Sequence, residues 1–283
     1  MRINTNVNSL NAQENATITN ANLKSSLEKL SSGLRINKAS DDASGLAIAD
    51  KLRTQASSIG QAISNGNSAV ALTQIADKAM AEQSNILDIV KQKLLQASTA
   101  TTSSAGRGAI EKDITKLLDQ LDNIAKQTNY NGILLLQASD GAAASSLTFQ
   151  MGESKDNIIT TTGSVQSNIS GLGLTNLKSQ VTNLSQATGA STARGLLETV
   201  DNAINKLNGW RADFGSTQNQ LESAIRNLST QQTNIKAAES VIRDVDYAQE
   251  SANFNKQNIV SQAGTFAMSQ ANQVQQNVLR LLQ

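Results

Sequence analysis

Apolar side chains recur along most of this chain at the three- and four-residue spacing that places them on one face of an α-helix. One stripe runs through residues 3–34, a longer one from about residue 42 to about residue 98, and a third through residues 110–124. At ~1.5 Å per residue, a helix over 42–98 would be roughly 80 Å long. The pattern therefore predicts rod-like helices and not the short elements of a thick core.

The second half of the chain carries the clearest repeat, because apolar residues return at intervals of seven. A sustained heptad predicts a left-handed coiled-coil seam. Polar residues at Arg211, Gln218 and Gln232 interrupt the second seam position, where they can fix register at a cost in stability. A further apolar stripe starts at residue 252 and continues to the end of the sequence. The predicted seam residues are Val200, Leu207, Phe214, Leu221, Leu228, Ile235 and Ile242.

The middle of the chain differs from both ends. Residues 128–136 contain Asn131-Gly132, a strong turn signal, and residues 146–162 alternate around a turn that contains glycine. Ser, Thr, Gly and Asn are frequent across 138–191, so we predict a hairpin and surface loops there.

These patterns run nearly symmetrically from the two ends of the sequence towards the middle. Before the middle segment the chain has a polar-rich helix, a joint and a long helix. After the middle segment it has the same three parts in reverse order. Antiparallel packing of the two halves brings both ends together. The predicted fold class is mainly α: a long antiparallel helical coiled-coil rod with a small β-hairpin region in the middle of the chain.

Composition narrows the chemistry. The 283 residues include one Trp, two Tyr and four Phe but no Pro, Cys or His. The commonest general base and the thiol nucleophiles and metal ligands are therefore missing. Residues 171–176 lack the third glycine of a dinucleotide loop. We predict no enzyme activity and no catalytic, cofactor-binding or metal site.

Charge and hydropathy point the same way. The net charge of +1 gives no general attraction to nucleic acid, and no apolar run approaches the ~18 residues of a membrane span. The aspartates at 41, 42, 244 and 246 could bind a cation, but capping of helix starts is the favoured interpretation.

The terminal stripes have two possible uses: packing on each other within one chain, or packing against other copies. A seam between two polar-rich helices buries little apolar area. At ~25 cal/mol per Å² this barely offsets an ordering cost of ~1–2 kcal/mol per residue. The second use is therefore favoured.

Five segments resemble the bacterial flagellin family. They are LSSGLRINKASDDASGLAIADKLR at 30–53, MRINTNVNSLNAQ at 1–13, TNYNG at 128–132, IRDVDYAQE at 242–250 and QQNVLRLLQ at 275–283. The resemblance covers about the first 136 and the last 90 residues. It implies a structural subunit that self-assembles into the flagellar filament, a passive propeller for motility.

The resemblance also implies a division into layers. Residues 1–42 and 246–283 would form the inner-tube layer, and 43–137 and 192–245 the rod of the outer-tube layer, with 138–191 as hairpin and surface loops. The expected polymerisation residues of the inner layer are Leu27, Leu30, Leu34, Ile259, Phe266, Val274, Val278 and Leu281. The expected interlayer joint comprises Gly33, Arg35, Asn37, Asp41, Asp42, Arg243, Asp244 and Asp246.

The family further implies an extracellular filament protein exported without a cleaved signal peptide. Its expected partners are other copies of itself, a flagellar export chaperone, the type III export apparatus, and the hook–filament junction and filament cap proteins. A hook–filament junction protein is the alternative function, because it shares the terminal helices. A flagellin carrying an enzyme in its middle segment is a weaker one, since 138–191 lacks His and Cys.

Many flagellins are detected by Toll-like receptor 5 through a stretch similar to QRVRELAVQ and a later Glu. The corresponding stretch here, DIVKQKLLQ at 88–96, differs at seven of the nine positions, four of which we expect to weaken receptor contacts, and the Glu is replaced by Asp. We therefore expect weakened recognition. The altered residues are Ile89, Lys91, Gln92, Lys93 and Asp113.

Overall fold

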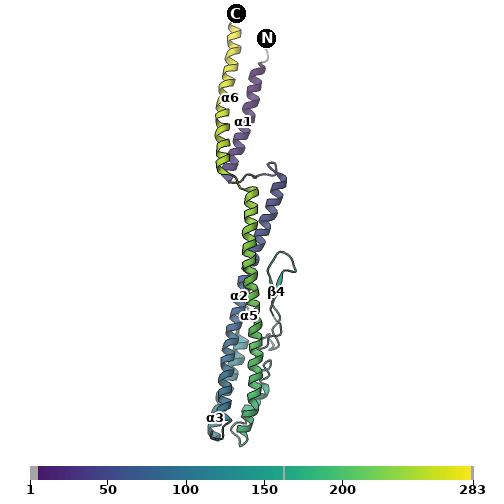
Figure 1. Cartoon of the computed structure of the whole chain (residues 1–283), viewed down its shortest axis with the longest axis vertical. Coiled ribbons are helices and arrows are strands. Elements are labelled where there is room, and N and C mark those ends of the chain that lie inside the picture. Colours follow the sequence, from purple (N-terminus) through teal and green to yellow (C-terminus); the bar gives the residue numbers. More distant parts are fainter. Residues whose placement is uncertain (1–5, 162, 282–283) are drawn as a thin grey trace. The chain divides into compact units, whose positions relative to one another are not determined.

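The computed structural model describes residues 6–161 and 163–281, with the side chains of 275 and 277–281 outside that description. The helices are α1 (Val7–Ser32), α2 (Ala43–Ala97), α3 (Ser104–Gln127), α4 (Thr175–Val181), α5 (Gly189–Arg243) and α6 (Tyr247–Leu281). The strands are β1 (Asn129–Tyr130), β2 (Ile133–Leu134), β3 (Thr148–Gln150) and β4 (Ile158–Thr160). The mainly α prediction is confirmed (Figure 1).

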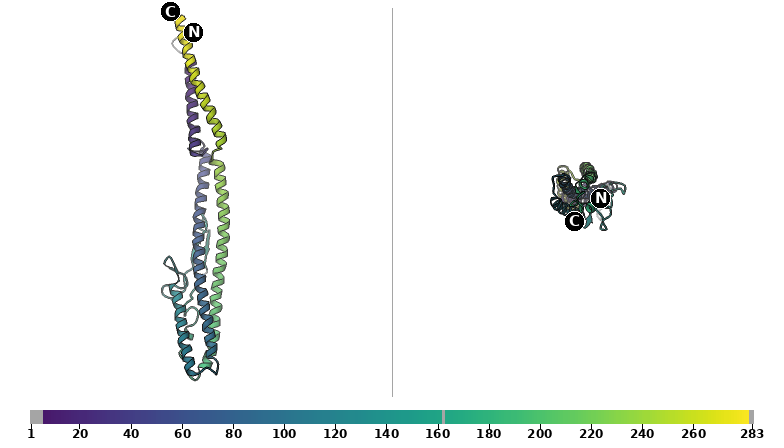
Figure 2. Two further views of the ribbon diagram at one scale, coloured as in Figure 1. Left: turned by 90° about the vertical axis from the view of Figure 1, so that its left-hand side faces the viewer. Right: turned by 90° about the horizontal axis from the view of Figure 1, so that it is seen from below.

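The chain forms two compact units. The terminal unit comprises Met1–Ser57 and Gln232–Gln283, and the central unit comprises Ser58–Gln231. In the terminal unit α1 and α6 lie side by side in both views, as Figures 1 and 2 show. In the central unit α2, α3 and α5 run alongside one another, with the hairpins lying against them.

The core of the central unit is a layer of aliphatic side chains between these three helices. Met80, Leu87 and Leu94 of α2 are fully buried, as are Ile114 and Leu118 of α3. Their steps of seven and four residues keep them on one face of each helix. Aliphatic side chains fill most of this thin space between helices, and Phe214 of α5 is a buried aromatic residue in the same core.

The predicted seam of α5 becomes less buried towards its C-terminal end. Val200, Leu207, Phe214 and Leu221 are buried, whereas Leu228, Ile235 and Ile242 are half-buried. The polar positions between them pair specifically. Arg211 Nε lies 3.0 Å from Asp77 Oδ1 on α2, and Gln232 donates to the carbonyl of Ala56 at 3.0 Å. Both contacts favour a single register, because a shifted helix leaves these groups without partners.

Two hairpins occupy the middle of the chain, where turn signals predict them. β1 and β2 are joined by Asn131 (φ 52°) and Gly132 (φ 81°), and two left-handed residues make the type of turn that matches strand twist. β3 pairs antiparallel with β4. Met151 and Ile159 of the second hairpin pack on Ala69 and Leu221, which fixes it to the helices.

Part of the middle segment is not surface loop, and this corrects the prediction for 138–191. The short helix α4 lies within it, and α5 begins at Gly189, three residues before the expected start of the long helix at 192. Leu174, Leu177, Val181 and Leu184 are all fully buried in the main core. Their spacing of three and four residues is helical, but frequent Ser, Thr and Asn around them mask the stripe.

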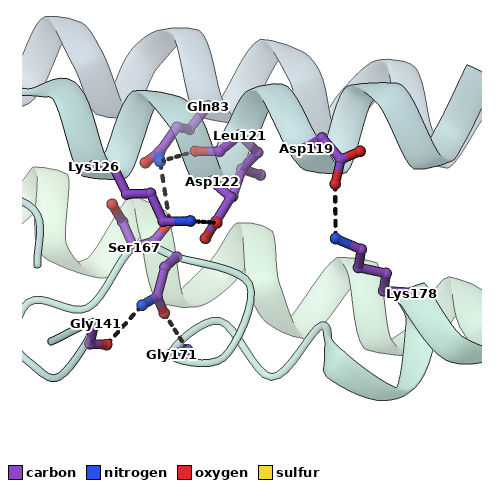
Figure 3. A network of polar contacts seen from close by, with 10 residues as sticks. Gln83, Asp119, Leu121, Asp122, Lys126, Gly141, Ser167, Gly171 and Lys178 are labelled. Carbon is purple, nitrogen blue, oxygen red and sulfur yellow. Dashed lines mark hydrogen bonds and ion pairs between the residues drawn. The ribbon is translucent and has the colours of Figure 1, made fainter.

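A buried amide connects this segment to the helices. Gln83 of α2 donates from Nε2 to the carbonyls of Leu121 and Ser167, both at 3.0 Å (Figure 3). Lys178 of α4 reaches Asp119 of α3 at 2.7 Å in the same view. The middle segment is thus part of the central unit.

We expect Leu221→Asp to unfold the central unit. The substitution removes a fully buried side chain and leaves a carboxylate in an apolar cluster, which costs roughly 3–5 kcal/mol or more. Thermal unfolding followed by circular dichroism measures the loss. Gln220→Asp places the same charge on the adjacent exposed position and serves as the control. Equal melting curves for the two variants would show that Leu221 is not a core residue.

Candidate functional site

The terminal pair, α1 and α6, meets along a seam made mostly of small and polar residues. The less exposed positions of both helices recur at alternating steps of three and four, as in an antiparallel coiled coil. On α1 they include Ala12, Ala16, Thr19, Leu23, Ser26 and Leu30. On α6 they include Glu250, Phe254, Gln257, Ser261, Gly264, Met268 and Ala271.

Three polar contacts, here called the ties, cross this seam. Asn6 Nδ2 donates to the carbonyl of Ala271 at 3.1 Å, and Ser261 Oγ donates to Asn20 Oδ1 at 3.0 Å. Near the other end the Ser26 hydroxyl donates to a Glu250 carboxylate oxygen. Hydrogen bonds of this kind contribute ~0.5–1.5 kcal/mol each, so they orient two helices more than they stabilise them.

Several large apolar side chains point away from the seam, although Leu23, Leu30, Phe254 and Met268 are half-buried in it. Phe266 is 78% exposed and Ile259 is 67% exposed. Fully burying one such side chain is worth ~1.5–3 kcal/mol, so the pair leaves a large favourable term unused. We call these exposed residues the outward apolar set: Val7, Leu10, Ile18, Leu27, Tyr247, Ile259, Val260, Phe266 and Val274.

The predicted polymerisation residues fall into three groups. Leu27, Ile259, Phe266 and Val274 belong to the outward apolar set. Leu30 is half-buried in the seam and Leu34 is half-buried just beyond α1. The side chains of Val278 and Leu281 lie outside the described residues.

Sequence reasoning did not select five members of the outward apolar set: Val7, Leu10, Ile18, Tyr247 and Val260. The exposed members do not form one regular stripe, since Leu27 lies about 180° around α1 from Ile18 at 3.6 residues per turn. Asn and Thr also separate them in the sequence, so periodicity does not mark them.

The joint connects the terminal pair to α2 and α5 through two chain crossings held by backbone hydrogen bonds. Leu34 and Asp244 form an isolated antiparallel bridge. The amide of Arg35 donates to the carbonyl of Arg243 at 2.7 Å, and the amide of Val245 donates to the carbonyl of Gly33 at 3.0 Å. The Arg35 guanidinium also donates to the carbonyl of Ile242 at 2.6 Å. The two crossings are therefore fixed to each other.

Two glycines suit the joint, Gly33 because of its left-handed backbone and Gly45 because little space is left for a side chain. Gly33 ends α1 with φ 73°, and a Cβ there would lie 3.1 Å from the Tyr247 hydroxyl. A Cβ on Gly45 would lie 2.4 Å from a carboxylate oxygen of Asp42 and 2.8 Å from Ile36. Any larger residue at either position displaces a neighbour.

The aspartates of the joint cap backbone turns, as the favoured interpretation of the sequence states. Asp42 accepts from the amide of Gly45 at 2.9 Å at the start of α2, and Asp246 accepts from the amide of Ala248 at 2.9 Å in α6. Asp244 accepts from the Ser240 hydroxyl at 2.6 Å. Among the described residues no cluster of three acidic side chains is arranged to hold a metal ion.

The Asp41 carboxylate holds the loop after Gly33 through two backbone hydrogen bonds. It accepts from the amides of Lys38 (2.9 Å) and Asn37 (3.0 Å), and these bonds lower the pKa of Asp41 from its ordinary value of 3.8. Lys38 in turn binds Glu28 of α1 at 2.7 Å, which raises the pKa of Lys38. The loop after Gly33 is thereby folded back on the end of α1.

The family can now be decided. The bacterial flagellin N-terminal helical region matches residues 3–140, and the bacterial flagellin C-terminal helical region matches residues 197–282. This chain belongs to the bacterial flagellin family. The resemblance found in the sequence is confirmed.

Full-length relatives agree with this assignment. The flagellin of Bacillus subtilis is 37% identical, with 100% of both chains covered, and the flagellar filament 33 kDa core protein of Treponema phagedenis is 34% identical with the same coverage. The crystal structure of Bacillus cereus flagellin shares 29% identity and a TM-score of 0.50 over 62% of this chain and 94% of that one.

A hook-associated protein of Vibrio parahaemolyticus has a TM-score of 0.62, covering 72% of this chain and 99% of that one. At 13% identity this likeness concerns the fold alone.

The family match and the full-length relatives show that the protein is a structural subunit that self-assembles into the flagellar filament, and nothing favours the junction alternative. None of the described helices has the length and apolar character needed to cross a membrane.

The predicted receptor stretch lies on α2 and α3 of the central unit. Lys93 Nζ and Asp113 Oδ2, two of the altered positions, form an ion pair at 2.9 Å. Lys91 pairs with Asp201 of α5. Ile89 is 42% exposed, and Gln92 is exposed.

The lowered pKa of Asp41 predicts a pH dependence of the joint. Because the folded pKa lies below 3.8, the stabilisation is present above about that pH and is lost as the pH falls through the folded value. We expect Asp41→Asn to exchange amide hydrogens in residues 33–42 faster than the native protein at neutral pH, with the difference shrinking as the pH falls through the folded pKa of Asp41. Deuterium uptake by mass spectrometry measures this. Glu14→Gln, on an exposed face of α1, is the control. Equal uptake at neutral pH would contradict the role of Asp41.

Proposed function

We propose that the terminal pair is the polymerising element of this flagellin and forms the inner layer of the filament. In this proposal the inner layer consists of residues 1–42 and 246–283, and the outer layer consists of residues 43–137 and 192–245. The joint connects the two layers. The observation that carries the proposal is the outward apolar set, which the pairing of α1 with α6 leaves in water. Large apolar side chains exposed at several places along one helix pair favour a surface that other copies cover.

The chemistry of the seam supports the same role. The other seam positions are small or polar, and the four large apolar ones, Leu23, Leu30, Phe254 and Met268, are only half-buried. The seam therefore buries too little apolar area to offset the entropy of ordering two helices. Burial of Phe266 and Ile259 against neighbouring copies supplies the apolar stabilisation that the seam lacks. Folding of the terminal pair is therefore coupled to assembly. This favours a free subunit whose ends are weakly ordered and a filament subunit whose ends are rigid.

Weakly ordered ends also suit the expected route to the filament. We propose export through the flagellar type III apparatus with a chaperone bound to the unpolymerised chain, then contact with the junction and cap proteins outside the cell. An outward apolar set on a subunit in the cytoplasm needs protection before assembly, and a chaperone groove meets that need.

We also propose that this flagellin is poorly detected by Toll-like receptor 5. Where the receptor-detected motif has Arg, Ile89 cannot make a bidentate contact. Lys93 is held by Asp113, so a partner that docks on this face must break an ion pair or cover a lysine. Lys91 is similarly engaged by Asp201.

We expect Phe266→Asp to abolish polymerisation without unfolding the central unit. The charge falls on a side chain that is 78% exposed in the subunit but would be buried in the filament. Sedimentation of seeded filaments and thermal melting of the subunit measure the two properties. Ser269→Asp, an exposed polar position of α6, is the matched control and should polymerise. Removal of the last ~20 residues, which takes away Val274, should likewise leave a soluble helical subunit that forms no filaments. Normal filaments from Phe266→Asp would refute the inner-layer assignment.

For the receptor we expect the double variant Ile89→Arg, Lys93→Leu to gain activity over the native protein by about tenfold or more. It restores two contacts of the QRVRELAVQ pattern at solvent-accessible positions. A receptor-reporter assay with purified monomer measures the gain. If the native protein activates the receptor at the same concentrations as a flagellin that contains QRVRELAVQ, the proposal is wrong.

A further inference from the structure

We propose that Asn131 is a site of spontaneous deamidation, a covalent modification that needs water and no enzyme. The chain contains three Asn-Gly dipeptides, at Asn65-Gly66, Asn131-Gly132 and Asn208-Gly209. Asparagine followed by glycine favours this reaction, because glycine has no Cβ to hinder attack by its own backbone nitrogen. The fold places the three pairs in different surroundings, and those surroundings select Asn131.

The reaction takes place between the Gly132 backbone and the Asn131 side chain. The Gly132 amide loses its proton to hydroxide, and its nitrogen forms a bond to Cγ of Asn131. The Cγ–Nδ2 bond breaks, and Nδ2 leaves as ammonia with a proton from water, so hydroxide is regenerated. Water then opens the resulting succinimide ring at either carbonyl and yields aspartate or isoaspartate.

The reacting atoms lie in the turn between β1 and β2, where both residues of the pair are exposed. A Cβ added to Gly132 would meet nothing within 4 Å beyond its chain neighbours. Among the described residues, no partner is hydrogen-bonded to the Gly132 amide or to the Asn131 side chain. The attacking nitrogen and the leaving group are therefore both open to solvent.

Ring closure requires the turn to change its backbone angles, and few contacts oppose that change. β1 and β2 pair through only two residues each, Asn129 with Leu134 and Tyr130 with Ile133. A short, exposed ladder opens at low cost, because the free energy of local opening depends on the backbone bonds and buried contacts that are lost. The turn can therefore reach the reactive conformation while the rest of the central unit stays folded.

The other two pairs are protected by helices. Gly209 lies inside α5, where its amide donates to the carbonyl four residues earlier, so attack requires part of α5 to unfold. Gly66 is buried in α2, and a Cβ there would lie 2.7 Å from Met151. The Asn65 side chain accepts from Gln61 at 3.0 Å. These pairs are internal controls with the same dipeptide.

Each product alters the turn. Aspartate adds a negative charge at an exposed position. Isoaspartate also adds one carbon to the backbone of a two-residue turn, so the pairing of Tyr130 with Ile133 no longer fits. The fraction of molecules with a loosened hairpin then rises with the age of the protein.

The test uses the full-length native protein, incubated in mildly alkaline buffer and digested at intervals. Mass spectrometry of the peptides follows the replacement of the side-chain amide by a carboxyl group at each Asn-Gly pair separately. A second sample is incubated in concentrated urea, where structure protects none of the three pairs. The variants Asn131→Gln and Asn208→Gln are matched, and their total isoaspartate is labelled with an isoaspartate methyltransferase and compared with that of the native protein.

We expect Asn131 to convert at least roughly tenfold faster than Asn65 and Asn208 in the native protein, and the three rates to become similar in urea. Asn131→Gln should remove most of the isoaspartate, and Asn208→Gln should leave it unchanged. Conversion of Asn131 no faster than that of the helical pairs overturns the inference. An equally large difference in urea also overturns it, because the fold would then not select Asn131.

Discussion

The structure depends on one constraint, the placement of several large apolar side chains on the outside of a helix pair whose seam is mostly small and polar. In the central unit apolar residues face inward, and Leu87, Leu94 and Ile114 are sealed from solvent. In the terminal unit the order is reversed, with Phe266 and Ile259 outside and Ser26 inside. The apolar residues of the central unit are thus covered within that unit, whereas the terminal pair leaves several large apolar side chains exposed.

This reversal accounts for other features of the chain. Aromatic residues are few, and a thin helical layer has no use for more. The joint holds its two chain crossings together through the backbone bridge between Leu34 and Asp244 and a glycine at position 33, without a large core.

The sequence predicted most of the fold because helical periodicity is a local property. The boundaries of α2, Ala43 and Ala97, fall within a residue of those expected, and the turn at Asn131-Gly132 forms where its dipeptide predicts. The helix α4 was missed because polar neighbours hide its short stripe, and its burial depends on α3 and α5. The burial of Gln83 between Leu121 and Ser167 was equally inaccessible, because both acceptors are backbone carbonyls brought together only by the tertiary fold.

Fewer residues of the terminal pair could be assigned a role from the sequence, because their roles depend on contacts between distant parts of the chain. Periodicity indicates that Phe266 and Leu30 belong to apolar stripes but does not say which stripe forms the seam. That choice depends on how α1 and α6 dock, and the sequence has no direct signal for the contact between Asn20 and Ser261. The structure assigns Leu30 to the seam and Leu27 to the outside.

Amide hydrogen exchange, compared between free subunit and filament, tests the central claim most directly. The account predicts weak protection of residues 7–32 and 247–274 in the free subunit and strong protection in the filament. Protection of residues 80–94 in the central unit should be strong in both states. Terminal helices already as protected in the free subunit as residues 80–94 would contradict the account, because the pair would then be stable without its neighbours.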